Sequence, residues 1–254
     1  MRARTASFQQ QSIQVHGLSM HTRTSINREP PIGDIVVVHG LIVASRYMMP
    51  VAELLAPDFR VFVPDFPGYG DSDKPLHVLN LPELAEILLE WMDRLGLERP
   101  SLLGVSFGSQ IIAEFAVRYP NRIDRAILGA PTFDRHARSL QQQLWRFFLN
   151  ARLENPTELP VQAYDYWLAG LPRIRRSIDI ALNDHIEDKL PAMQCPTIVV
   201  RGSKDPVVPQ AWAEEVTRLL PNGHLAIIPG AGHTINYSNA LEFSRIARGF
   251  LCDR

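Results

Sequence analysis

Six apolar runs alternate with segments of helical periodicity along this chain, and this alternation constrains its fold more than any other feature. The runs are DIVVVHG, RVFVPDF, SLLGVS, RAILGAP, PTIVVRG and HLAIIPG, which begin at residues 34, 60, 101, 125, 196 and 224. Continuous runs of this kind, rich in Val, Ile and Leu, are typical of strands buried on both faces of a parallel sheet. We therefore predict an α/β fold with a mostly parallel, doubly wound sheet.

Helical segments fill the gaps between these runs. Residues 81–96 place Leu84, Ile87, Leu88 and Trp91 on one face, with a proline near the start and a glycine at the end. Further helices are expected over residues 108–119, 211–220 and 240–251. The segment SIQVHGLSMHTRTS alternates around a glycine, which predicts a β-hairpin at one edge of the sheet. With the hairpin, the predicted sheet has eight strands.

Residues 133–194 interrupt the alternation because they show helical pattern only. The segment is too long for a simple crossover between consecutive strands. We interpret it as a helical cap inserted into a core formed by residues 1–132 and 195–254. Ligands in such sheets bind beyond the carboxyl ends of the strands, and the cap is expected to cover that edge.

Aromatic side chains are concentrated in the predicted cap. Five of them are candidates for the wall of a substrate pocket, since ligand cavities are mostly apolar and aromatic: Trp145, Phe148, Tyr164, Tyr166 and Trp167. One helical stripe in the cap is instead interpreted as a packing surface; it consists of Leu140, Leu144, Phe147 and Phe148.

Composition and charge exclude several classes of partner. The formal net charge is −1, which favours neither nucleic acid nor an anionic membrane as a partner. Two widely separated cysteines, Cys195 and Cys252, form no disulfide framework or zinc motif and fit a reducing compartment. No secretory signal pattern and no run of 18 apolar residues is present. We expect a cytoplasmic monomer or homodimer that acts on a small molecule.

The motif GVSFG places Ser106 where a buried strand gives way to a helix. In that context G-x-S-x-G predicts a nucleophile elbow, a turn so tight that the serine adopts positive φ and side chains at Gly104 and Gly108 would collide. The pentapeptide alone also fits a serine that merely caps a helix. The amide of Phe107 is expected to point to the same place as the hydroxyl, at the positive end of the helix dipole.

Two further polar residues follow later apolar runs. Asp205 comes just after TIVV, and His233 just after LAII. A serine hydroxyl becomes nucleophilic when a base takes its proton, and that base is usually a histidine held by a carboxylate. Asp134 and Asp184 are weaker candidates than Asp205 for this carboxylate, because they fall in the predicted cap.

No metal or organic cofactor is implied by the remaining residues. Six other histidines show no metal-ligand spacing and are interpreted as structural or surface residues: His16, His21, His77, His136, His185 and His224. The segment PDFPGYGDSDKP contains Gly68 and Gly70 but lacks the third glycine of a dinucleotide-binding motif.

The motifs VVHGL, VPDFPGYGDSDKP, GVSFGS, YPNRIDRAIL, PTIVVRGSKDPVVP and IPGAGHTI stand in an order and spacing that resemble the α/β-hydrolase fold superfamily. The resemblance is to its cap-bearing branch, which includes small-ester hydrolases and carbon–carbon bond hydrolases. It implies that Ser106 is the nucleophile, His233 the general base and acid, and Asp205 the carboxylate that orients the histidine.

The same resemblance implies an oxyanion hole made by the amides of Leu41 and Phe107. Gly40 would let the backbone approach the substrate, and His39 would brace the loop. Two positions depart from the commonest pattern: Ser109 stands where a glycine often follows the elbow, and NYSNALEF stands where Glu-x-Pro usually follows the histidine.

The expected activity is hydrolysis of a small to medium, mostly apolar carboxylic ester through an acyl-enzyme. One alternative is carbon–carbon bond hydrolysis of a diketo acid, whose carboxylates Arg173, Arg175 or Arg176 could bind. Lactonase, amidase, thioesterase and perhydrolase activities stay open. A different class is a ligand-binding module of the same fold without turnover. Epoxide hydrolases and dehalogenases use an aspartate in the place of Ser106 and are disfavoured.

Overall fold

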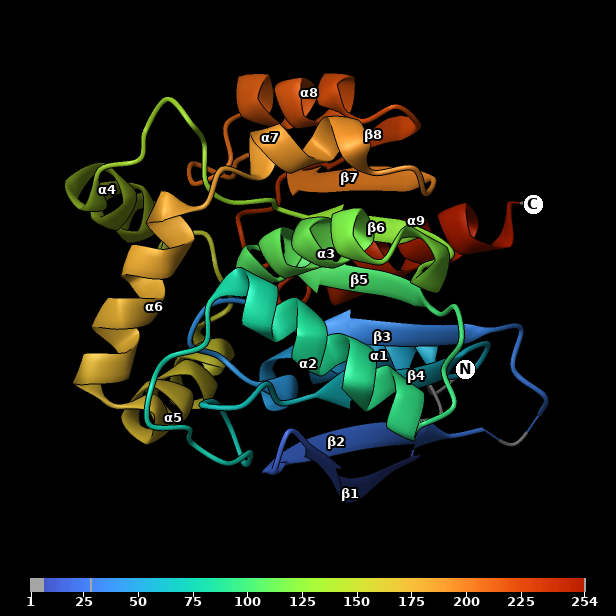
Figure 1. Ribbon diagram of the computed structural model, residues 1–254. Coiled ribbons are helices and arrows are strands. Elements are labelled where there is room, and N and C mark those ends of the chain that lie inside the picture. Colours follow the sequence, from blue (N-terminus) through green and yellow to red (C-terminus); the bar gives the residue numbers. More distant parts are fainter. Residues whose placement is uncertain (1–6, 28, 254) are drawn as a thin grey trace.

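A single eight-stranded sheet forms the centre of the protein in a computed structural model that describes residues 7–27 and 29–253 (Figure 1). Its strands are β1 (Ser7–Val15), β2 (Leu18–Ile26), β3 (Asp34–Val38), β4 (Arg60–Pro64), β5 (Ser101–Val105), β6 (Ala126–Gly129), β7 (Thr197–Gly202) and β8 (Gly223–Ile228). The spatial order is β1-β2-β4-β3-β5-β6-β7-β8. Strands β1 and β2 pair antiparallel, as do β2 and β4, and the other pairs are parallel. The predicted α/β sheet with an edge hairpin is confirmed.

Helices cover both faces of this sheet (Figure 1). They are α1 (Ser45–Leu55), α2 (Leu81–Arg94), α3 (Phe107–Arg118), α8 (Gln210–Leu219) and α9 (Ala240–Cys252). Helices α1 and α9 contact each other on one face, and α2 and α3 contact each other on the opposite face. Helix α2 begins with a capping box in which Asn80 and Glu83 each accept the other's backbone N–H.

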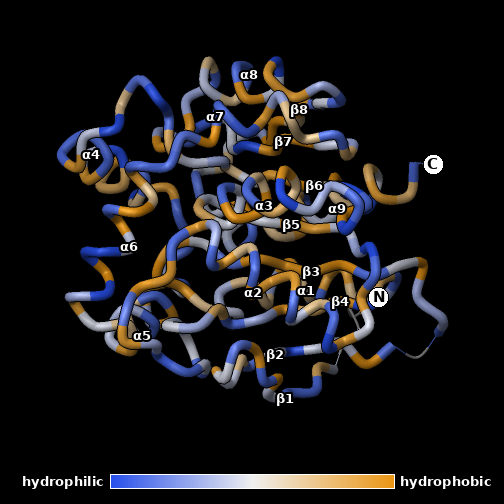
Figure 2. The backbone as a smooth tube through the Cα atoms, in the orientation of Figure 1, coloured by the Kyte–Doolittle hydropathy of each residue, from blue (hydrophilic) through white to orange (hydrophobic). Residues whose placement is uncertain are grey.

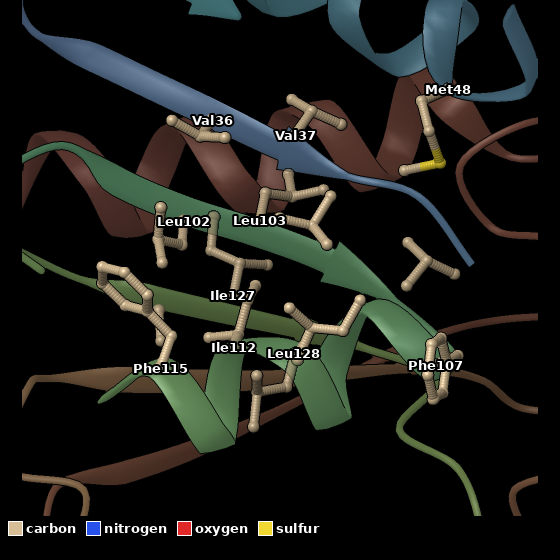
Figure 3. Close-up of a cluster of buried hydrophobic side chains, with 14 of the residues drawn as sticks. Val36, Val37, Met48, Leu102, Leu103, Phe107, Ile112, Phe115, Ile127 and Leu128 are labelled. Atoms are coloured by element: carbon tan, nitrogen blue, oxygen red, sulfur yellow. The ribbon is translucent and has the colours of Figure 1, made fainter. Parts of the chain in front are cut away.

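The hydrophobic core lies along the central strands, where Figure 2 shows a concentration of apolar residues. Val36 of β3, Leu102 of β5 and Ile127 of β6 are fully buried. Figure 3 shows these side chains together with Ile112 and Phe115 of α3. Burial of one such side chain contributes about 1.5–3 kcal/mol. The strands need apolar residues at successive positions because helices cover both faces of the sheet.

The inserted segment lies mainly beyond the carboxyl ends of the strands (Figure 1). It contains α4 (Leu140–Asn150), η2 (Pro156–Glu158), α5 (Leu159–Ala169), α6 (Leu171–Asn183), α7 (Ile186–Lys189) and η3 (Leu190–Ala192). Its last part returns to the core, because α7 contacts α3 and η3 contacts α8. Within residues 7–27 and 29–253, no helix combines the length and the apolar character needed to cross a bilayer.

The tight turn between β5 and α3 depends on the lack of side chains at Gly104 and Gly108. A Cβ atom at Gly104 would lie 2.6 Å from the carbonyl carbon and oxygen of Gly108 and 2.8 Å from Cδ1 of Ile112. A Cβ atom at Gly108 would lie 2.6 Å from the carbonyl oxygen of Val38. All of these distances are shorter than van der Waals contact. Helix α3 can therefore approach β5 and β3 this closely only with glycine at positions 104 and 108.

We predict that Gly104→Ala lowers the free energy of unfolding by about 1–3 kcal/mol, because the added methyl group must displace backbone. Gly249→Ala is the matched control: Gly249 lies in α9 with open space around it, so alanine should raise stability by about 0.5–1 kcal/mol. Urea unfolding followed by circular dichroism measures both. Equal stability of the two variants would contradict the close approach at the turn.

Candidate active site

Ser106 lies between β5 and α3 in a strained backbone conformation, with φ 58° and ψ −119°. A non-glycine residue in such a region costs about 1–3 kcal/mol and persists where the surroundings enforce it. The Ser106 N–H donates to the carbonyl of Gly129 at 2.8 Å, which ties the turn to β6. The Ser106 Oγ lies 3.4 Å from Oγ1 of the buried Thr132.

Asp205 and His233 occupy the loops that follow β7 and β8. The Asp205 Oδ2 lies 2.9 Å from Nδ1 of His233. The other carboxylate oxygen of Asp205 accepts the N–H groups of Val207 and Val208 at 2.8 and 3.0 Å. The carboxylate is therefore fixed at both oxygens, and it orients the imidazole so that Nε2 is the nitrogen left for other chemistry.

Ser106 and His233 line the same cavity, but no hydrogen bond joins them in this structure. The Nε2 atom of His233 is buried and has no hydrogen-bond partner among the described residues. The Ser106 hydroxyl instead points to Thr132, a neighbour that sequence analysis did not identify.

The pKa of His233 is raised above its ordinary value of 6.5 by its surroundings. Burial of the ring acts in the opposite direction and lowers the pKa. The charge and hydrogen bond of Asp205, together with the charges of Glu154 and Glu158, outweigh burial.

The loop after β3 lies close to Ser106. A Cβ atom at Gly40 would lie 3.7 Å from the Ser106 Cβ, and Ile42 adopts φ 69°. Neither the Leu41 nor the Phe107 N–H donates a hydrogen bond to an acceptor within residues 7–27 and 29–253. The strained Ile42 is a feature of this loop that the sequence pattern did not indicate.

His39 holds the start of that loop, as its interpretation as a bracing residue suggests. Its Nε2 accepts the N–H of Phe66 at 3.1 Å, so the ring proton is on Nδ1, which lies 2.8 Å from the Gly40 carbonyl oxygen. Burial lowers the pKa of His39, which favours this neutral form. The ring also meets Phe66 and Tyr69 edge-on, with centroids 5.5 and 5.6 Å away.

The cavity above Ser106 has a volume of about 420 Å³ and a mostly apolar wall. Gly40, Leu41 and Val43 line it from the core, and α4 contributes Leu140, Leu144 and Phe147. These three α4 residues were interpreted as packing surface, and the structure instead places them on the cavity wall. Helical periodicity shows that they share a face but does not identify what that face meets.

Most of the cap aromatics expected on the pocket wall lie elsewhere. Trp145 and Trp167 are 60% and 75% exposed, and neither lines the cavity. Phe148 stacks on Trp145 with centroids 5.6 Å apart, and Tyr164 lies beneath Arg46 at 4.7 Å. Of the residues expected to bind substrate, Gly40 and Tyr166 lie on the wall of this cavity.

The charged groups that line the cavity are acidic. Glu154 and Glu158 line it, whereas no lysine or arginine of the described chain does. Burial and the neighbouring charge of Glu154 raise the pKa of Glu158 to about 7. Arg173 donates to the Pro75 carbonyl at 2.7 Å, and Arg176 pairs with Asp179, so neither reaches the cavity.

One other cluster has the composition of a metal site. Ligand atoms of His21, Asp65 and Asp71 lie within 4.8 Å of one another. Asp65 already accepts bonds from the N–H groups of Ser45 and Asp71 and contacts His21 at 3.1 Å, while Asp71 pairs with Arg46 at 2.9 Å. These interactions satisfy the carboxylates within the protein, which does not favour metal binding.

The fold and this cavity at the carboxyl edge of the sheet define an α/β hydrolase. The chain belongs to the alpha/beta hydrolase family, whose model matches residues 35–246.

Relatives of several activities are similar to this chain. A poly(3-hydroxyalkanoate) depolymerase of Ectopseudomonas oleovorans is 25% identical over 88% of this chain and 86% of its own length. A 2-hydroxy-6-oxononadienedioate/2-hydroxy-6-oxononatrienedioate hydrolase of Paraburkholderia phymatum is 27% identical over 76% of each chain. The structure of a thermophilic esterase from Thermogutta terrifontis matches with a TM-score of 0.77 and 22% identity, over 96% of this chain and 98% of the esterase.

We predict that Asp205→Asn lowers the pKa of His233, because burial of the ring then acts without its strongest opposing charge. Titration of the imidazole by nitrogen-detected NMR measures the change. Asp134→Asn is the control, since Asp134 is buried but pairs with Arg146 at 2.9 Å rather than with His233. An unchanged pKa of His233 in Asp205→Asn would contradict the stated cause of the shift.

Proposed function

We propose that the protein is a serine hydrolase that cleaves small to medium, neutral and mostly apolar carboxylic esters through an acyl-enzyme. The observation that carries this proposal is the convergence of three elements at one apolar cavity. Ser106 at positive φ and His233 both line that cavity, and Asp205 bonds the far nitrogen of the histidine at 2.9 Å.

In the proposed reaction, the Ser106 Oγ attacks the ester carbonyl carbon while Nε2 of His233 takes the hydroxyl proton. Rotation about the Ser106 Cα–Cβ bond would move the hydroxyl from Thr132 toward the imidazole. Collapse of the tetrahedral intermediate breaks the carbon–oxygen bond of the ester, and His233 returns its proton to the leaving alcohol. Water, deprotonated by the same nitrogen, then attacks the acyl carbon. The bond between that carbon and the Ser106 Oγ breaks, the carboxylic acid leaves, and His233 returns the proton to Oγ.

The amides of Leu41 and Phe107 would bind the oxyanion in both tetrahedral intermediates. Their lack of an acceptor among the described residues supports this role. Loss of a fixed donor of this kind typically costs about 2.7–4 kcal/mol of transition-state stabilisation. The proposed oxyanion role would also account for the strain at Ile42, which directly follows Leu41 in the loop after β3.

A neutral ester fits the cavity better than a diketo acid does. Glu154 and Glu158 would repel a substrate carboxylate, and no lysine or arginine of the described residues lines the cavity to bind one. The names of the similar proteins cover both classes, since one is an esterase and another hydrolyses a dienedioate. The charge of the wall is therefore the observation that favours the ester.

The proposed organisation assigns the chemistry to the core of residues 1–132 and 195–254 and the apolar part of the wall to the cap of residues 133–194. Leu140, Leu144 and Phe147 would contact the acyl or alcohol group of the substrate. A binding module without turnover would use the same cavity. Reaction of Ser106 with a fluorophosphonate probe distinguishes a hydrolase from such a module.

We predict that Ser106→Ala leaves the circular dichroism spectrum unchanged and lowers kcat by roughly 10⁴–10⁶. A fluorophosphonate probe should label the wild type at Ser106 and leave Ser106→Ala unlabelled. Ser203→Ala removes an exposed serine from the same edge of the sheet and should label as the wild type does. Labelling of Ser106→Ala at the wild-type rate would reject Ser106 as the nucleophile.

We also predict that 4-nitrophenyl butyrate has a kcat/KM at least about tenfold higher than the 4-nitrophenyl monoester of succinic acid. The two acyl chains are similar in length and differ in a terminal carboxylate, which the acidic wall should repel. The assay belongs at about pH 8, where Glu158 is ionised because its pKa is about 7. Faster turnover of the succinate monoester, or of a ring-cleavage diketo acid, would favour the alternative substrate class.

A further inference from the structure

We infer that Glu154, in the turn after α4, is a positioning residue through which the cap fixes the backbone of His233. The inference rests on the proposed role of His233 as the base. It concerns a residue for which the sequence gives no signal, since Glu154 is 79 residues from His233 and belongs to no motif.

The Glu154 carboxylate accepts three hydrogen bonds from the histidine loop. Its Oε1 accepts the N–H of His233 at 2.6 Å and the N–H of Thr234 at 2.9 Å. Its Oε2 accepts the hydroxyl of Thr234. Asn150, the last residue of α4, adds a second acceptor for the His233 N–H at 2.9 Å. Hydrogen bonds to a charged acceptor are the strong ones, so this carboxylate has a large share in setting the loop conformation.

Gly232 provides the space that the carboxylate occupies. A Cβ atom at Gly232 would lie 2.5 Å from the Glu154 Oε1 and 2.9 Å from the Asn150 Oδ1. A side chain at Gly232 would therefore displace the Glu154 carboxylate and the Asn150 side chain from the histidine loop. This close approach explains on physical grounds why the residue before His233 is a glycine.

Other contacts continue the same seam between cap and loop. The Asn155 N–H donates to the Ser238 Oγ at 2.9 Å, and the Tyr237 hydroxyl donates to the Thr157 carbonyl at 3.2 Å. The Phe147 ring meets the imidazole edge-on with centroids 5.5 Å apart. Asp205 holds the far side of the ring from the core, so the position of His233 depends on the cap being seated.

The charge of Glu154 acts on the same histidine. The carboxylates that raise the pKa of His233 are Asp205 from the core and Glu154 and Glu158 from the cap. A base must be neutral to accept a proton, so the rate falls as the pH drops through the pKa of His233. Loss of the Glu154 charge lowers that pKa and moves the acid limb to lower pH, which a purely structural contact would not do.

The test is the rate at which a fluorophosphonate probe reacts with Ser106, measured against pH in three variants. Glu154→Ala removes acceptor and charge, and its plateau rate should fall about 10- to 100-fold. Glu154→Gln keeps an amide oxygen for the two N–H groups, so it should recover part of the plateau rate, with the acid limb at lower pH. The control is Glu215→Gln, which removes a different contact between cap and core, to His136 at 3.3 Å. It should leave the plateau rate and the acid limb unchanged.

Gly232→Ala is a second way to remove the contact between Glu154 and the His233 loop, because the added methyl group displaces the Glu154 carboxylate. Its loss of rate should be much smaller in the Glu154→Ala background than in the wild type, as expected for residues that act through one contact. Additive losses would overturn the inference, as would a wild-type rate in Glu154→Ala. If circular dichroism shows that Glu154→Ala is unfolded, the acid limb of the pH–rate profile of Glu154→Gln is the test instead. A shift of that limb to lower pH supports the inference, and an unshifted limb overturns it. A wild type that fails to react would refute the proposed function itself.

Discussion

The close approach of α3 to β5 is the constraint on which the rest of the structure depends. Gly104 and Gly108 leave no room for side chains, and the chain can turn between them only if Ser106 accepts positive φ. That turn places Ser106 on the wall of the cavity, directly before Phe107, the first residue of α3. The loop of Gly40 then packs against the same turn, so a single steric fit brings this loop and the serine together.

The histidine is held from two sides that belong to different parts of the chain. Asp205 fixes the ring from the core, and the cap fixes the backbone through Glu154. The proposed base would therefore be in place only while the cap is seated over the cavity. The carboxylates that give this control also make the wall acidic, so positioning of His233 and the preference for neutral substrates would share one cause. This coupling links the geometry of the cap to both rate and selectivity in the proposed enzyme.

The sequence predicted the sheet well because β3 to β7 are buried on both faces and so read as uninterrupted apolar runs. It missed α1, in which Pro50 lies inside the helix and removes a backbone donor. The elbow was identified because its glycines are adjacent in sequence to Ser106. The cap was harder: periodicity groups residues by face, but packing decides which face meets the cavity, and Trp145 lies on the exposed one. The role inferred for Glu154 could not be predicted from the sequence, because a single glutamate in a turn belongs to no motif.

The most direct measurement of the central claim is a crystal structure of the protein after reaction with a fluorophosphonate. The account predicts a phosphorus atom bonded to the Ser106 Oγ, with one phosphonyl oxygen about 2.7–3.1 Å from the N–H groups of both Leu41 and Phe107. The Nε2 atom of His233 should face the same group from the opposite side. A phosphonyl oxygen that points away from those two amides, or an adduct on another residue, would contradict the account.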